Sequence, residues 1–205
     1  MLITFEGGEG AGKSVQAKLL SEYLISIGIK VVLTREPGGT PLSEEIRKTL
    51  LTGDVDKIAP ITESLLYLAA RSDHWIRKIK PALDNCISVV CDRYQDSSVV
   101  YQGICKKVNI NLLNIIYSEI TNGILPDITY LIDIDPKIGI SRSLERNGNI
   151  ETRFEQMDLS FHKKVRKGFL DLAQEEPHRF IVIDGSLSIE EIHAEIISNL
   201  QKHSV

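Results

Sequence analysis

GGEGAGKS, residues 7–14, is the stretch that decides the fold, and it fits the pattern GxxxxGK(S/T) at every required position. It follows a short apolar run at residues 2–6, which predicts a strand, and leads into a helical pattern at residues 13–27. The pattern is specific for a phosphate-binding loop only when a strand precedes it and a helix follows it, as is predicted here. Glycines let the backbone curl so that successive N–H groups face phosphate oxygens, and the helix start adds the positive end of its dipole. The stretch therefore predicts a loop that holds a phosphate chain.

Two side chains of this loop are expected to act on the bound nucleotide. Lys13 is expected to reach the β- and γ-phosphates, and the Ser14 hydroxyl is expected to ligate Mg²⁺. The residues predicted to bind ATP from this loop are Gly7, Gly8, Glu9, Gly10, Ala11, Gly12, Lys13 and Ser14.

Around the loop, short apolar runs alternate with longer helical patterns. Strands are expected at residues 2–6, 31–34, 87–91, 129–134 and 180–183. Helices are expected at residues 13–27, 41–51, 63–83 with a bend near Pro81, 111–121, 136–144, 154–174 and 189–200. The strands are continuous apolar runs, which is typical of a parallel sheet covered by helices on both faces. We therefore expect a single α/β domain over residues 1–205.

The composition argues against several classes of protein. A chain of 205 residues suits one domain with a sizeable core, and its net charge of −4 argues against broad binding of nucleic acid. No apolar run approaches the ~20 residues that span a bilayer, and the start carries no signal-peptide pattern. The three cysteines lack CxxC spacing, so they are interpreted as reduced thiols of a cytoplasmic protein.

Charged residues follow two of the expected strands. Asp92 ends the strand at 87–91, at the edge of an open α/β sheet where ligands bind, and can hold Mg²⁺ or orient an acceptor. The alternative is an aspartate that caps a turn, which the neighbouring cation Arg93 disfavours. Arg35 ends the second strand and suits a phosphate through its bidentate fork, although a surface ion pair is the alternative.

Further candidates lie on helices and in a polar segment at residues 145–153. Arg71 follows two alanines, with Tyr67 one turn earlier, so the pair can face a phosphate and a flat base; a solvated arginine and a core tyrosine are the alternatives. The polar segment is expected to be mobile. An arginine that closes over the γ-phosphate can accelerate transfer about 10³-fold, whereas a solvated loop is the other interpretation. The candidates for that arginine are Arg142, Arg146 and Arg153.

Several short motifs follow the phosphate loop in a fixed order. They are Thr-Arg-Glu-Pro-Gly-Gly-Thr at 34–40, Ala-Ala-Arg at 69–71, Asp-Arg-Tyr at 92–94 and Tyr-Gln-Gly at 101–103. This ordered set resembles the thymidylate kinase family over nearly the whole chain. The resemblance implies a P-loop nucleoside monophosphate kinase fold and Mg²⁺-dependent phosphate transfer from ATP to dTMP, giving dTDP for dTTP synthesis and DNA replication. It also implies a homodimer, to which Leu65, Leu66, Leu68 and residues 112–116 are candidates to contribute.

The resemblance implies an acceptor site built around three arginines. Arg35, Arg71 and Arg93 would hold the 5′-phosphate, and Tyr67 would stack on thymine. Ser98, with Ser97 beside it, would read the edge of the base. The residues that the resemblance assigns to dTMP binding are Glu9, Arg35, Tyr67, Arg71, Arg93, Ser97, Ser98 and Tyr101.

Tyr101 would crowd the 2′ position of the sugar, and Glu9 would lie near the sugar and the metal. The family has two branches, with a catalytic arginine either in the phosphate loop or in a lid. The loop here contains no arginine, so the chain resembles the bacterial lid-arginine type, with a mobile lid around residues 142–154. Arg146 is the first choice for the transition-state cation, with Arg142 expected to contact ATP. The expected catalytic residues are Glu9, Lys13, Arg93, Arg146 and Arg153, and the expected metal ligands are Ser14 and Asp92.

Three other functions fit parts of the sequence. A related kinase would use another acceptor, although a nucleoside acceptor would not need three arginines around a phosphate. A GTPase switch would carry an Asn-Lys-x-Asp segment after a strand, and the chain has Asp133-Ile134-Asp135-Pro136 there instead. An inactive homologue is disfavoured because every motif position is retained.

Overall fold

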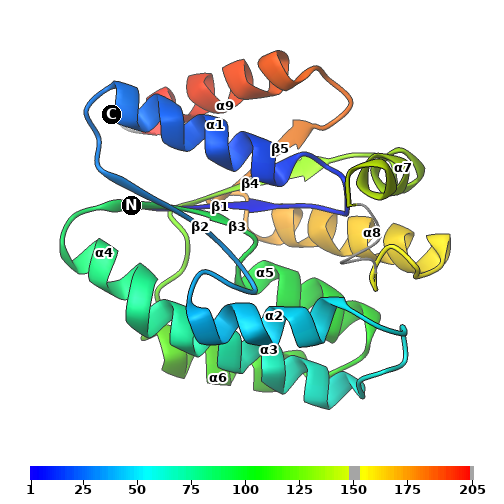
Figure 1. The fold of residues 1–205 in the computed structure, drawn as a ribbon. Coiled ribbons are helices and arrows are strands. Elements are labelled where there is room, and N and C mark those ends of the chain that lie inside the picture. The colour runs from blue at the N-terminus through cyan, green and yellow to red at the C-terminus, as the bar shows by residue number, and fades with distance from the viewer. Residues whose placement is uncertain (148–152, 204–205) are drawn as a thin grey trace.

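The computed structural model describes residues 1–147 and 153–203, and it has a five-stranded parallel sheet at its centre (Figure 1). The strand order is β2-β3-β1-β4-β5. The strands are β1 (Leu2–Glu6), β2 (Val31–Arg35), β3 (Ser88–Asp92), β4 (Ile128–Asp133) and β5 (Phe180–Asp184). All five lie within a residue of their predicted bounds, and the parallel sheet is confirmed. The inner strands β1, β3 and β4 are almost entirely buried, which is typical of a parallel sheet covered by helices.

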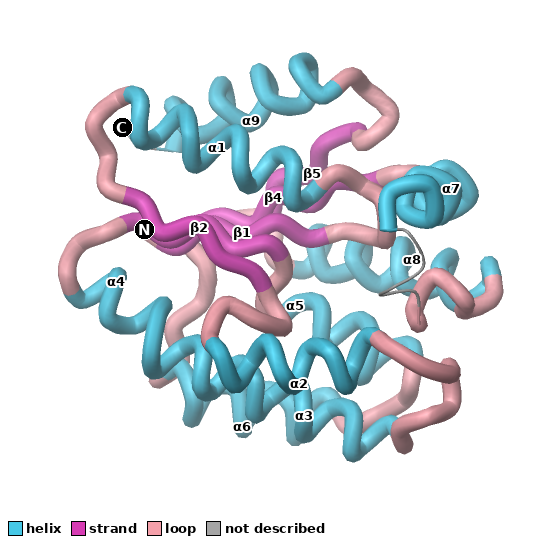
Figure 2. Tube along the Cα trace, in the orientation of Figure 1, coloured by secondary structure: helices cyan, strands magenta, loops and turns pink. Residues whose placement is uncertain are grey.

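Helices cover both faces of the sheet (Figure 2). On one face lie α1 (Lys13–Ser26) and α9 (Ile189–His203), which pack on the strands through a cluster that includes Leu20 and Ile196. The remaining helical elements are α2 (Pro41–Leu51), α3 (Pro60–His74), η1 (Trp75–Ile79), α4 (Lys80–Asp84), α5 (Gln95–Ser98), η2 (Val99–Cys105), α6 (Ile110–Thr121), α7 (Pro136–Asn147) and α8 (Leu159–Glu175). Within the described ranges, none of the helices combines the length and apolar character that crossing a membrane requires.

Two predicted helices differ from the structure, and one helical segment was not predicted. The helix expected at 63–83 begins at Pro60 and passes through a π-helical turn at 75–79, just before the expected bend at Pro81, whose missing N–H removes a helical hydrogen bond. The helix expected from Phe154 begins at Leu159, because the Asp158 carboxylate caps it by accepting from Phe161 N. The segment at 95–105 forms α5 and η2, which were not predicted.

The sheet brings the ends of three strands together. Phe5 of β1 is in register with Asp92 of β3, and Asp92 is in register with Arg35 of β2. The phosphate loop starts directly after β1. Its glycines, the strand-end arginine and the strand-end carboxylate therefore share the carboxyl edge of the sheet, as predicted for an open α/β sheet.

Candidate active site

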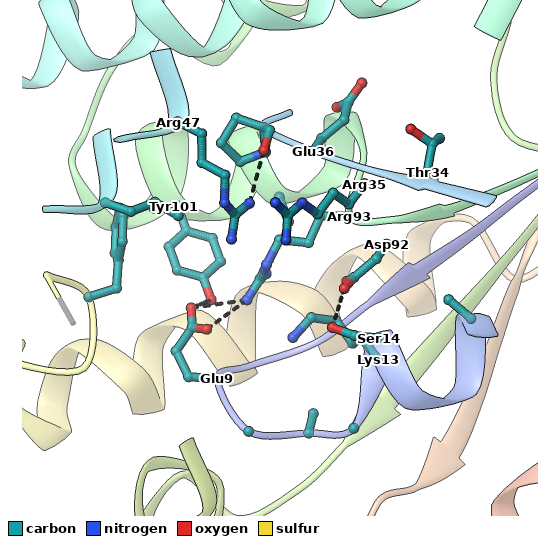
Figure 3. Close-up of a pocket in the computed structure, with 18 of the residues that line it drawn as sticks. Glu9, Lys13, Ser14, Thr34, Arg35, Glu36, Arg47, Asp92, Arg93 and Tyr101 are labelled. Carbon is teal, nitrogen blue, oxygen red and sulfur yellow. Dashed lines mark hydrogen bonds and ion pairs between the residues drawn. The ribbon is translucent and has the colours of Figure 1, made fainter. Parts of the chain in front are cut away.

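A cavity of about 640 Å³ opens at this edge of the sheet (Figure 3). One wall is the phosphate loop with the start of α1, and the opposite wall comes from β2, α2, α3 and η2. The predicted site residues that line it are Glu9, Gly10, Ala11, Gly12, Lys13, Ser14, Arg35, Tyr67, Arg71, Asp92, Arg93, Ser97 and Tyr101.

The phosphate loop has the backbone that its glycines predict. Gly7, Gly10 and Gly12 have φ values of 139°, 65° and 98°, in the region that favours glycine. The Lys13 ammonium lies over the loop and donates to Gly8 O at 2.6 Å. The pKa of Lys13 is lowered to about 8, chiefly by burial and also by the cation Arg93, against the opposing pull of Glu9 and Asp92.

The phosphate loop rests on the first turns of α7. A Cβ atom on Gly10 would lie 1.8 Å from the carbonyl oxygen of Gly139, and a Cβ atom on Gly139 would lie 2.3 Å from the carbonyl oxygen of Glu9. Only glycine fits at both positions. The loop and α7 are therefore held backbone against backbone.

The two predicted metal ligands meet at the start of α1. The Ser14 hydroxyl donates to Asp92 Oδ2, and the buried Oδ1 of Asp92 has no hydrogen-bond partner among the described residues. A hydroxyl oxygen beside a carboxylate with a free lone-pair oxygen is a donor set that suits Mg²⁺. The arrangement fits the magnesium ion that was expected here.

Glu9, Arg93 and Tyr101 form a charged group at the bottom of the cavity. Arg93 Nη2 lies 3.0 Å from both oxygens of Glu9, and the Tyr101 hydroxyl donates to Glu9 Oε1 at 2.8 Å. Burial alone would raise the pKa of Glu9, but Arg93 and Lys13 outweigh it and lower that pKa to about 2. Glu9 is therefore an anion at every physiological pH.

Arg71 is fixed by a buried network behind the cavity. Its Nε donates to Glu36 Oε2 at 2.5 Å, and the other carboxylate oxygen lies 3.0 Å from His74 Nδ1. The guanidinium lies over the Tyr67 ring, 5.7 Å from its centroid, so Tyr67 is one turn away on the same face, as predicted. Glu36 belongs to the motif at 34–40, but the sequence alone assigned it no role.

The neighbouring residues Ser97 and Ser98 each bond a different arginine of the site. The Ser98 hydroxyl accepts from Arg71, and Ser98 is not among the residues that line the cavity; the base-edge contact expected of it stays a prediction. The Ser97 hydroxyl lines the cavity and accepts from Arg93 Nη1 at 3.2 Å. Of the two serines, Ser97 is thus the one that lines the cavity in this structure.

Two cations lie at the upper rim of the cavity (Figure 3). Arg35 is 51% exposed and pairs with Glu44 at 3.0 Å, so it combines the cavity position with the surface ion pair that was its alternative. Arg47 of α2 also lines the cavity and donates to Pro37 O at 2.9 Å. Sequence reasoning missed Arg47, although its spacing of four residues from both Ser43 and Leu51 places all three on one helix face.

Arg142 and Arg153, the two candidate arginines whose side chains the structure describes, do not line the cavity. Arg142 donates to Gly185 O at 3.1 Å, after β5. Arg153 is buried against α2 and α3, with Nη1 2.7 Å from Glu63 Oε2 and 3.0 Å from Leu50 O. This position differs from the catalytic one predicted for Arg153. Arg146 lies in α7, but its side chain, like the centre of the expected lid at 148–152, is outside the described residues.

Known proteins match the chain over almost its entire length. The family model described as thymidylate kinase matches residues 5–196. A thymidylate kinase from Magnetococcus marinus is 47% identical over 95% of this chain and 92% of its own length. One from Deinococcus radiodurans is 45% identical over 96% of this chain and 94% of its own. The crystal structure of thymidylate kinase from Ehrlichia chaffeensis aligns with a TM-score of 0.79 at 36% identity, covering 98% of both chains.

A phosphate loop facing an arginine-rich cavity on a five-stranded parallel sheet defines the class, a phosphotransferase of the P-loop nucleoside monophosphate kinase fold. Within that class, the relatives described above are all thymidylate kinases. The chain belongs to the thymidylate kinase family.

Proposed function

We propose that this enzyme transfers the γ-phosphate of ATP to dTMP, producing ADP and dTDP for dTTP synthesis and DNA replication. The observation that carries the proposal is that one cavity joins the phosphate loop to Arg35, Arg71 and Arg93. A donor phosphate chain and an acceptor phosphate monoester both need positive partners, and the cavity offers them on opposite walls.

The residues act mainly by positioning. The acceptor phosphate is largely dianionic near neutral pH, since a phosphate monoester loses its second proton near pH 6, so no strong base is needed. Lys13 and the N–H groups of residues 7–14 hold the donor, and Arg35 and Arg93 hold the acceptor in line with it. Ser14 and Asp92 would hold Mg²⁺, which when bound neutralises phosphate charge.

The acceptor's base and sugar are assigned to the opposite wall. Tyr67 would stack on thymine, Arg71 supplies donors beside it, and Ser97 lines the same cavity. The Tyr101 ring is packed against Phe154 at 5.4 Å between centroids, and its hydroxyl is bonded to Glu9. That rigid pair would crowd a 2′-hydroxyl and favour a deoxyribose.

We also infer that Arg146 is the transition-state cation, supplied by a mobile lid around residues 142–154, and that Arg142 contacts ATP. The absence of arginine from the phosphate loop supports a cation from elsewhere in the chain. Arg153, which is held by Glu63 and by backbone carbonyls, is assigned to packing instead.

A homodimer is proposed as the assembly. Leu65 of α3 and Ile115 of α6 are 52% and 63% exposed, and the two helices pack side by side. Leu68 and Leu113, from the same predicted stretches, are core residues instead. The free thiols of Cys86, Cys91 and Cys105 suit a reducing compartment, so we infer a cytoplasmic location.

The proposed activity is tested with a panel of acceptors. Purified enzyme is given ATP and Mg²⁺ with dTMP, dUMP, dCMP, dGMP or AMP, and diphosphate formation is followed by chromatography. Highest kcat/KM with dTMP is expected. Faster turnover of another monophosphate would reassign the acceptor, and tight GTP binding without transfer would favour a switch protein.

A further inference from the structure

Glu6, the last residue of β1, is fully buried and has no part in the proposed reaction, yet its carboxylate accepts several hydrogen bonds. Oε1 accepts from Tyr94 N at 2.7 Å and from Ser97 N at 3.3 Å. Oε2 accepts from the Ser97 hydroxyl at 2.6 Å. A buried carboxylate is retained only where such hydrogen bonds offset its desolvation, so these contacts are specific.

The contacts hold a strained turn. Arg93 has φ = 68°, which is rare for a residue with a side chain. Its own N–H donates to Phe5 O at 2.9 Å, and the next N–H, of Tyr94, donates to Glu6. The end of β1 therefore accepts hydrogen bonds from the amides of both Arg93 and Tyr94. Tyr94 supplies no side-chain cap to α5, and the Glu6 carboxylate takes that role from another strand.

The same contacts reach the Arg93 guanidinium. Arg93 Nη1 donates to Gly7 O at 3.1 Å and to the Ser97 hydroxyl that is bonded to Glu6. Its Nη2 is held by Glu9. The backbone of Arg93 is thus fixed by Phe5, next to Glu6 in the chain, and its side-chain tip is fixed in part by Gly7 and Ser97, which Glu6 precedes and bonds.

We propose that Glu6 is a positioning residue for acceptor binding, which holds the turn at residues 92–94 so that Arg93 projects into the cavity. The inference rests on the proposed function, because it needs an acceptor phosphate at Arg93. It goes further in assigning acceptor affinity to a group that never touches the acceptor.

The charges around Glu6 make this support sensitive to pH. The pKa of Glu6 is raised to about 7, chiefly by burial and also by the anion Asp96, while Arg93 acts in the opposite direction. Asp96 is itself paired with Arg179 at 2.8 Å. The other charged or titratable groups that interact with Glu6 are Lys13, Arg71 and Cys91. A protonated Glu6 loses one accepting position beside Ser97, so acceptor affinity is expected to fall as the pH drops through about 7.

The decisive variant is Glu6→Gln, compared with wild type and with Asp133→Asn. Asp133 ends the neighbouring strand β4 and pairs with Arg166 at 2.7 Å, away from the turn. Calorimetry measures binding of dTMP alone and of a non-hydrolysable ATP analogue alone at pH 8. Glu6→Gln is expected to weaken dTMP binding about tenfold or more and to change analogue binding by no more than about twofold, because a lost bond to a charged group has effects of that size. Asp133→Asn is expected to leave dTMP binding unchanged.

Two results would overturn the inference. One is dTMP binding by Glu6→Gln within about twofold of wild type; the other is an equal loss for dTMP and the analogue, as a general structural role predicts. Failure of wild type to bind dTMP would instead contradict the proposed function. A second measurement uses wild type alone: the amide proton resonances of Tyr94 and Ser97 are expected to titrate together with one common midpoint, because both amides donate to the same carboxylate oxygen of Glu6. Should Glu6→Gln not fold, resonances that do not titrate together overturn the inference by themselves.

Discussion

At the scale of single residues, Lys13 is a group whose charge can change close to neutral pH. Its pKa is lowered to about 8 in the free enzyme, chiefly by burial. A bound polyphosphate favours the protonated form, so binding takes up a proton when the pH is near or above 8. ATP affinity is therefore expected to fall as the pH rises from 7 to 9.5.

The measurement is calorimetry of ATP binding across that range, in two buffers with different ionisation enthalpies. Lys13→Arg is the matched variant, since arginine stays charged, and its affinity is expected to vary less with pH. Constant affinity in wild type up to pH 9.5, without proton uptake, would contradict the role given to Lys13.

Substitution of Arg153 is expected to affect stability, whereas substitution of Arg146 is expected to affect catalysis. Arg153→Met leaves the buried Glu63 carboxylate with Lys106 as its remaining cation, and is expected to cost about 3 kcal/mol of unfolding free energy. Arg146→Ala is expected to lower kcat about 10³-fold with little change in stability. Urea unfolding and steady-state kinetics of both variants check this. Loss of kcat in a stably folded Arg153→Met, with normal turnover in Arg146→Ala, would exchange the two roles.

The sequence identified most residues of the site because they lie in motifs or directly after strands. Glu6 and Arg47 were missed for a physical reason. A lone glutamate at a strand end and a lone arginine on a helix resemble solvated residues until the fold places Glu6 beneath the turn and Arg47 at the cavity. The same limit applies to Arg153, since only tertiary packing buries it.

At the scale of elements, the contact between the phosphate loop and α7 links donor binding to the helix that leads toward the expected lid. Gly139→Ala would favour α7 by helix propensity, by up to about 1 kcal/mol. The added Cβ, however, would lie 2.3 Å from Glu9 O, so α7 or the loop must move. We expect a net loss of about 1–3 kcal/mol of stability and a raised KM for ATP, with the KM for dTMP little changed.

Ser141→Ala is the control for this variant, since Ser141 lies on the exposed side of α7 and bonds only Glu145 at 3.3 Å among the described contacts. Kinetics with each substrate varied in turn and thermal unfolding of both variants provide the measurements. A Gly139→Ala enzyme with normal stability and normal KM for ATP would show that the contact is easily relieved.

The elements that were predicted well and poorly differ in their burial. Helices such as α2 and α9 have one apolar and one polar face, so their period is visible in the sequence. The stretch at 95–105 was missed because Val99, Val100 and Tyr101 and their neighbours are buried all round, which leaves no polar face. β-Branched valines and Gly103 further disfavour a helix there.

At the scale of the whole molecule, the proposed dimer interface on α3 and α6 can be tested by substitution. Leu65→Glu puts a charge into the proposed apolar interface and is expected to shift the enzyme from dimer to monomer. Ile25→Glu is the control, because Ile25 is equally exposed, at 59%, on α1 across the sheet. Sedimentation velocity measures both. Dissociation caused by Ile25→Glu and not by Leu65→Glu would move the interface to the other face.

The strand order also has a consequence for synthesis on the ribosome. β1 is the central strand, but Leu2 is in register with Val89 and Ile3 with Ile128, so both neighbours of β1 emerge long after it. At about 5–20 residues per second, the nascent chain carries an apolar strand without its full set of partners for roughly ten seconds. During that interval both edges of β1 are open to other chains. The arrangement that puts the phosphate loop at the centre of the finished enzyme thus leaves its first strand without both partner strands for much of translation.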